Sequence, residues 1–162
     1  MRDLTAGRLR ELLDYCPDTG VFTRKIRTSN RVKVGDVAGF LRHDGYIGIC
    51  VHRGWFLAHR LAWLHVHGEW PAKFLDHING DRSDNRITNL RKATNAENKQ
   101  NSLRPHVDNK TGYLGVCHDK EKFKAQICIN GRIRYIGCFP TPEAAHAAYL
   151  EAKRRLHPFG TI

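Results

Sequence analysis

The chain lacks the features that would direct it into or across a membrane. No apolar run approaches the roughly 20 residues that a spanning helix needs. Residues 1–15 mix charged and apolar side chains, so we expect no signal peptide. The five cysteines are an odd number without a Cys-x-x-Cys pair, which argues against a disulfide framework and a structural zinc site. We therefore expect a protein of a reducing cytoplasm.

The chain also has fewer acidic residues than basic residues. The chain has 27 Lys and Arg against 16 Asp and Glu, a formal charge of +11 in 162 residues. Such an excess indicates a polyanionic partner, most often nucleic acid, although a solvated basic surface is the simpler alternative. This length suits one large domain or two or three small ones.

Residues 1–54 are predicted to form a helix and a small antiparallel sheet. Leucines at helical spacing predict a helix over 4–13, with Thr5 as its N-cap. A second helix is predicted over 58–67, and its three histidines are assigned to packing or phosphate contact rather than to a metal. Short β-prone segments between glycine turns predict strands at 21–27, 37–40, 45–51 and 55–57.

The densest polar stretch lies in the centre of the chain. Residues 74–78 are predicted to form a short strand that runs into an Asn-Gly turn, and residues 90–93 the returning strand. Thr94 and Glu97 match a capping box, which begins a helix that carries Asn98. The order is therefore strand, loop, strand, helix.

This central segment, residues 55–102, resembles the core of the HNH endonucleases, whose ββα-metal fold holds one divalent ion between a hairpin and a helix. The family's signature positions fall on His77, Asn89 and Asn98. The surrounding Asp-His-Ile-Asn-Gly-Asp, Asp-Asn-Arg and Asn-Leu are similar to a subgroup common in phage and mobile genes. The resemblance implies that His77 is the general base, that Asn89 orients His77 or ties the loop, and that Asp76 and Asn98 bind Mg²⁺ or Mn²⁺.

The chemistry of phosphodiester hydrolysis explains these residue types. The reaction needs an activated water and neutralisation of charge on the phosphate. A neutral imidazole can accept the proton, and carboxylate and amide oxygens are ligands that Mg²⁺ prefers. Neighbours in a regular strand point to opposite faces, so Asp76 and His77 can share a site only if the strand ends or bulges there. The alternative is a polar loop stabilised by Asx turns.

Residues 103–110 are predicted to be a linker, and residues 111–162 a three-stranded antiparallel sheet with a helix. The helix begins at Thr141-Pro142, runs to about Leu156 and ends at His157-Pro158. An Asn-Gly pair at 130–131 predicts a type I′ turn between the last two strands. The three strands are predicted at 112–116, 122–129 and 132–139.

This C-terminal segment is similar to AP2-type DNA-binding domains. The resemblance is carried by Gly-Val, Phe-Lys-Ala-Gln-Ile, Tyr-Ile-Gly-Cys-Phe and Thr-Pro-Glu-Ala-Ala. It implies that the sheet lies in the major groove with the helix packed behind it. The DNA-binding residues expected there are Lys122, Lys124, Gln126, Arg132, Arg134 and Tyr135.

Strand alternation assigns faces to some of these residues. Lys124 and Gln126 face away from the helix, where Gln can pair with adenine and Lys with guanine or phosphate. The family pattern puts Tyr135 on the DNA face, which turns Arg132 and Arg134 the other way unless the strand bulges. Those two arginines then contact flanking phosphates or belong to a solvated face.

Together these patterns predict an α+β protein that cuts double-stranded DNA with one divalent metal. The combination of HNH and AP2-like segments is typical of homing-type endonucleases of phages, acting in the cytoplasm of a bacterial host. No membrane or small-molecule partner is expected. Two alternatives stay open, a DNA-binding regulator without catalysis and an RNA-binding protein. The target site, the number of strands cut and the oligomeric state are not determined by the sequence.

Overall fold

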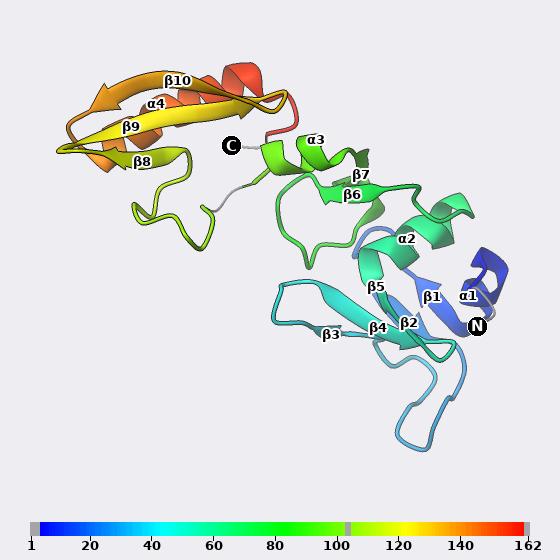
Figure 1. Cartoon of the computed structure of the whole chain (residues 1–162). Helices are drawn as coiled ribbons and strands as arrows, with labels where there is room; N and C mark the ends of the chain where they lie inside the picture. The colour runs from blue at the N-terminus through cyan, green and yellow to red at the C-terminus, as the bar shows by residue number, and fades with distance from the viewer. Residues whose placement is uncertain (1–3, 103–104, 161–162) are drawn as a thin grey trace. The chain divides into compact units, whose positions relative to one another are not determined.

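The computed structural model describes residues 4–102 and 105–160. Over these residues the protein is α+β, with four α-helices and small antiparallel sheets (Figure 1). It falls into two compact units, divided between Ala93 and Thr94. Residues 103–104, which open the predicted linker, and residues 1–3 and 161–162 lie outside the description. Among the described helices, none is long and apolar enough to cross a membrane.

The first unit consists of two helices and three small sheets, with strand orders β1-β2, β3-β4-β5 and β6-β7. A short 3₁₀ helix, η1, precedes the last strand. Its elements in chain order are α1 (Ala6–Leu12), β1 (Leu13–Tyr15), β2 (Phe22–Arg24), β3 (Phe40–Leu41), β4 (Ile47–Val51), β5 (Gly54–Leu57), α2 (Ala58–His67), β6 (Phe74–His77), η1 (Ile87–Asn89) and β7 (Leu90–Ala93).

The core of the first unit is built mainly from leucines and other aliphatic side chains of α1, α2 and β4. Each fully buried aliphatic side chain contributes about 1.5–3 kcal/mol relative to exposure. The helix α2 ends at His67 and is capped by Gly68, which has a left-handed φ of 79°. Large side chains with under 2% exposure include Leu9, Leu13, Phe22, Ile49 and Leu61.

Several predictions for this unit are confirmed and others are wrong. Thr5 caps α1, and α2 has the predicted bounds. The first helix stops before Leu13, because Leu13 is extended and pairs with Arg24 in a strand that was not predicted. The strand predicted at 37–40 is also wrong, since Val37 makes only an isolated bridge and β3 starts at Phe40. The N-terminal strands therefore form two sheets instead of one.

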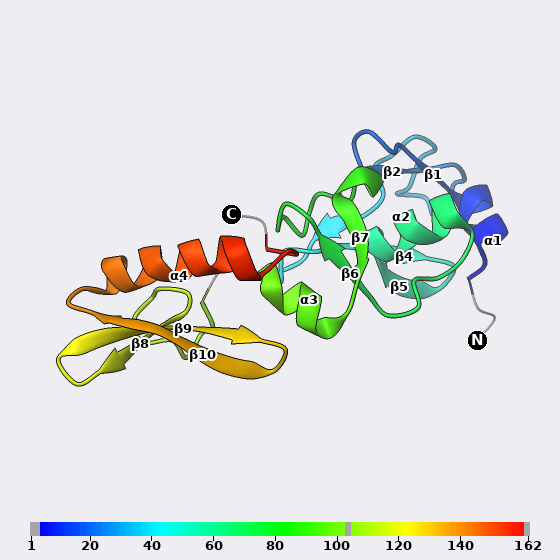
Figure 2. The same ribbon diagram turned by 90° about the horizontal axis from the view of Figure 1, so that it is seen from above.

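The second unit is a three-stranded antiparallel sheet covered on one face by a long helix. The strand order is β10-β9-β8, and Figure 2 shows α4 running along the sheet. Small and aromatic side chains fill the layer between them, led by Ala125, Ile127, Ala145, Tyr149 and Ala152. The elements are α3 (Asn95–Gln100), β8 (Val116–Asp119), β9 (Lys122–Ile129), β10 (Arg132–Phe139) and α4 (Pro142–Leu156).

Most predictions for the second unit are confirmed. The strands β9 and β10 and the helix α4 have the predicted bounds, and Thr141 caps α4. Asn130 and Gly131 have φ values of 50° and 76°, as a type I′ turn requires. The strand predicted at 112–116 is wrong, because Gly112 and Gly115 both have positive φ and β8 begins only at Val116. Gly115 leaves no room for a side chain, since an added Cβ would collide with the ring of Tyr149.

Candidate active site

The polar central stretch forms a hairpin in the first unit. The strands β6 and β7 pair in a regular register, with Asp76 opposite Arg91 and His77 opposite Leu90. β6 ends at His77, and the loop is closed by the amide of Ile78, which donates to the carbonyl of Asn89 at 2.9 Å. The strand ends at His77, but Asp76 and His77 are both paired within this regular register, so their side chains leave the strand on opposite faces.

Asp76 is a buried carboxylate, 4% exposed, that is bound by an arginine. Arg91 Nε and Nη2 donate to Asp76 Oδ2 at 2.9 and 2.7 Å. Charge-assisted hydrogen bonds of this kind fix a carboxylate more tightly than neutral ones do. Arg91 was not predicted from the sequence, because only the strand register places it opposite Asp76.

His77 is equally buried and lies in a cluster of three rings. Its ring centroid is 5.1 Å from that of His59, at the start of α2, and 5.8 Å from that of Tyr46, which precedes β4. His59 and Tyr46 are themselves 5.1 Å apart. His59 was assigned to packing or phosphate contact, and its ring packs against that of the predicted general base. Tyr46 was not singled out from the sequence.

Burial sets the charge of both histidines. It lowers the pKa of His59 to about 3, with smaller contributions from His77 and Arg60. It also lowers the pKa of His77, although interaction with the side chain of Asn85, which favours the protonated ring, opposes this effect. A histidine with a lowered pKa is neutral at pH 7 and has a nitrogen that can accept a proton.

Asn89 binds the loop of the hairpin. Its Oδ1 accepts from the amide of Asn79 at 3.0 Å, and its Nδ2 donates to Asn79 Oδ1 and to the carbonyl of Asp84, both at 2.9 Å. The loop also has Asx turns, with Asp81 Oδ1 accepting from the Ser83 amide at 2.9 Å. The loop tie that the resemblance implies for Asn89 and the Asx turns of the alternative interpretation are therefore both present.

The fourth residue of the predicted site, Asn98, is half-buried on α3 in the second unit. The capping box at the start of this helix is complete. The Glu97 amide donates to Thr94 Oγ1 at 3.2 Å, and the Thr94 amide donates to Glu97 Oε2 at 2.6 Å. Asn98 therefore belongs to the second unit, whereas Asp76, His77 and Asn89 belong to the first.

The predicted DNA-binding residues lie on β9 and β10 of the second unit. Paired residues in an antiparallel sheet share a face. Gln126 is paired with Tyr135 and Lys124 with Cys138, opposite to the face that buries Ala125 under α4. Tyr135 is 64% exposed, so its ring is available to a partner.

The two arginines of β10 lie on the other face by register. Arg132 is paired with Ile129 and Arg134 with Ile127, which both belong to the layer under α4. A register shift does occur in β10, but it falls between Tyr135 and Gly137, after both arginines. Both are exposed at the edge of the sheet, and Lys122 is exposed opposite Asp119.

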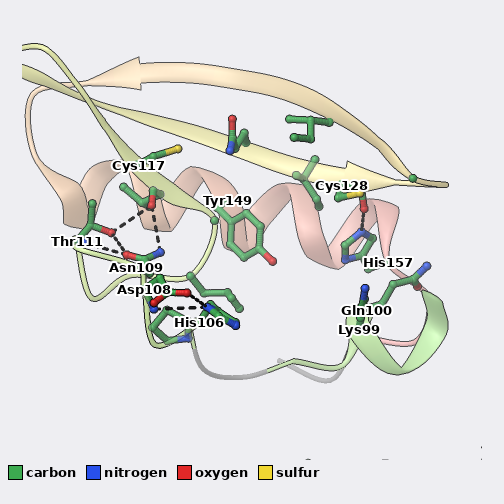
Figure 3. Close-up of a pocket in the computed structure, with 18 of the residues that line it drawn as sticks. Lys99, Gln100, His106, Asp108, Asn109, Thr111, Cys117, Cys128, Tyr149 and His157 are labelled. Atoms are coloured by element: carbon green, nitrogen blue, oxygen red, sulfur yellow. Dashed lines mark hydrogen bonds and ion pairs between the residues drawn. The ribbon is translucent and has the colours of Figure 1, made fainter. Parts of the chain in front are cut away.

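The second unit also contains a cavity of about 920 Å³ beside β9, where β8 no longer pairs with it (Figure 3). Tyr149 points into it, and His157 Nε2 lies 2.9 Å from the carbonyl of Cys128 at its edge. Of the predicted site residues, Gln126 lines it. All the residues that line this cavity belong to the second unit, whereas Asp76 and His77 belong to the first.

Comparison with protein families finds a match in the centre of the chain. Residues 56–100 match the family model of the HNH endonucleases, and this segment contains α2, β6, β7 and α3. No curated protein and no solved structure matches the chain. The match covers less than half of the 162 residues and supports an HNH nuclease that acts on nucleic acid. HNH nucleases generally use a divalent metal. In the ranges that the structure describes, no three His, Cys, Asp or Glu side chains form a cluster that could hold one.

Proposed function

We propose that this protein is a metal-dependent endonuclease that cuts double-stranded DNA, a homing-type enzyme of phage origin that acts in the bacterial cytoplasm. The observation that carries the proposal is the position and burial of His77. This residue lies within the segment that matches the HNH endonucleases, at the end of β6, buried and with a lowered pKa. These are the properties of a general base held neutral near pH 7.

The proton transfer follows from this state of His77. A neutral imidazole nitrogen accepts the proton of a water molecule as that water attacks the phosphorus, and the 3′ oxygen leaves on the opposite side. The rings of His59 and Tyr46 restrict the orientation of His77. The tie that Asn89 makes across the loop holds the backbone that follows His77. Fixed geometry of this kind is worth several powers of ten in rate.

Asp76 and Asn98 are the residues that would hold Mg²⁺ or Mn²⁺. A buried carboxylate and an amide are hard oxygen donors, and such a pair leaves coordination positions for water and phosphate, as Mg²⁺ sites usually do. Arg91 fixes one carboxylate oxygen of Asp76 and so orients the group. When bound, the ion supplies neutralisation of charge on the phosphate and on the leaving oxygen.

The C-terminal sheet is proposed to bind the DNA as an AP2-like domain. Its face away from α4 carries Lys124, Gln126 and Tyr135, which suit contacts to base edges and phosphates. Arg132 and Arg134, exposed at the sheet edge, suit flanking phosphates. Binding that depends on such phosphate contacts weakens steeply as salt rises.

The test is cleavage of supercoiled plasmid and phage DNA in Mg²⁺, in Mn²⁺ and in chelator. Wild-type protein should cut only with metal, and His77→Ala should cut at least about 100-fold more slowly, as loss of a general base predicts. The exposed His43 provides a matched control, and His43→Ala should cut like wild type. Cleavage by His77→Ala at the wild-type rate, or no cleavage by wild type with either metal, would contradict the proposal.

A further inference from the structure

The sheet β3-β4-β5 of the first unit has an exposed face with two aromatic side chains. Phe40 is 52% exposed and Trp55 67% exposed, and their rings meet edge to face with centroids 5.6 Å apart. Phe40 is paired with Gly48 and Trp55 with Cys50, so both aromatics stand on the same side of the sheet. We refer to these four residues as the Phe40–Trp55 face.

This face is hollowed. A groove of about 260 Å³ is lined by both aromatic residues and by Gly48. Val37, 70% exposed, extends the apolar surface at its rim. A cluster of exposed apolar side chains on a small unit is costly in water, and such patches usually mark an interaction site. The described contacts of the first unit do not cover it.

The surroundings of the groove are mainly basic, although one carboxylate, that of Asp36, also lines it. Arg24 lines the groove and is held there by a hydrogen bond from its Nη1 to the carbonyl of Cys50, at 3.0 Å. The segment that follows contains Lys25, Arg27, Arg31 and Lys33, all exposed, and no acidic residue occurs between Asp18 and Asp36. Five positive charges within ten residues next to an apolar groove complement a polyanion that also has apolar surface.

We propose that the Phe40–Trp55 face is a second DNA-binding surface, which binds duplex DNA beside the cleavage site. The basic segment contacts phosphates, and Phe40 and Trp55 press against sugars and base steps of the minor groove. An edge-to-face pair projects as a wedge and does not form the flat row of rings on which single-stranded bases stack. The proposal rests on the proposed function, because that function supplies DNA as the substrate.

The experiment measures binding of the full chain to a fluorescent duplex by anisotropy, in chelator so that no cleavage occurs. Phe40→Ala with Trp55→Ala should weaken binding at least about tenfold, as removal of aromatic contacts to DNA does. Trp55→Phe, which keeps a ring, should retain most of the affinity. Val66→Ala is the control for an exposed apolar residue outside the face and should bind like wild type.

The charge contribution is tested by the salt dependence. Arg31→Gln with Lys33→Gln should lower the slope of log K against log salt by about two, because each phosphate contact contributes about 0.9. Lys73→Gln, an exposed lysine outside the basic segment, is the matched control and should leave the slope unchanged. Circular dichroism of each variant verifies the fold.

Three results would overturn the proposal. The first is that the variants bind duplex with the affinity and the salt slope of wild type. The second is that wild-type protein binds single strands through this face in preference to duplex. The third is a change of oligomeric state in the aromatic double variant, which would make the face a protein interface. The proposed function fails separately. If wild-type protein binds duplex through this face but never cuts with metal, only the endonuclease proposal fails. If it cuts while the face variants bind normally, only the DNA-binding face fails.

Discussion

Acidification should destabilise the first unit through His59. Burial lowers the pKa of this histidine to about 3 in the folded protein, whereas in the unfolded chain it is close to 6.5. Between these values the unfolded chain binds a proton that the folded protein does not. The stability associated with neutral His59 is therefore complete above pH 6.5 and is lost progressively as the pH falls towards 3.

The size of the effect follows from the size of the shift. Each pH unit within this window changes the free energy of unfolding by about 1.4 kcal/mol, so the loss between pH 6.5 and pH 4 is about 3 kcal/mol. This is a large part of the roughly 5–15 kcal/mol that stabilises a typical domain. Asp84, whose pKa is lowered to about 2 by Arg86, loses its contribution only at still lower pH.

Urea unfolding followed by circular dichroism, in chelator and from pH 8 to pH 4, measures the difference. The comparison is between wild type and His59→Leu, which keeps an apolar side chain in the buried position. The free energy of unfolding of wild type should fall more steeply, by about 3 kcal/mol over the window. His43→Leu, at an exposed site, should follow wild type. Parallel curves for wild type and His59→Leu would refute the reasoning.

Three further predictions concern the hairpin loop of the first unit and two positions in the second unit. Asn89→Ala removes three hydrogen bonds of the hairpin loop and should lower the free energy of unfolding by about 2 kcal/mol, measured by urea denaturation; a loss under 0.5 kcal/mol would contradict the assigned tie. Gly115→Ala places a Cβ against the ring of Tyr149, at a residue whose φ is positive. The thermal midpoint of the second unit should therefore fall by several degrees, and an unchanged midpoint would contradict this prediction. Thr94→Ala breaks the capping box with Glu97 and should speed amide hydrogen exchange in α3 about fivefold, for a loss of about 1 kcal/mol; equal exchange would argue against the cap.

Local sequence chemistry predicted the elements whose ends depend on single residues. The helix α4 begins at a threonine cap followed by proline, and the β9-β10 hairpin turns at Asn130-Gly131 with both residues at positive φ. The capping box of α3 was likewise readable from Thr94 and Glu97. These features act within a few residues of one another, so they do not depend on the rest of the fold.

Strands without such signals were misplaced. Leu13 continued an apolar helical pattern, but its backbone pairs with Arg24 in β1 and β2. Gly112 and Gly115 stood in a β-prone segment, yet both have positive φ and β8 begins after them. A strand exists through its partner, and the partner is distant along the chain, so propensity alone does not determine its bounds.

For the candidate site, the sequence alone determined which chemical groups are available and in what order. His77, Asn89 and Asn98 lie within the segment that matches the HNH endonucleases, and the residues around them predict a hairpin and a helix. Only the tertiary structure decided their surroundings. Arg91 beside Asp76 depends on strand register, and the packing of His59 against His77 brings α2 to the end of β6. The charge of a buried histidine is set by loss of water from around it, and that loss arises only when distant segments pack together.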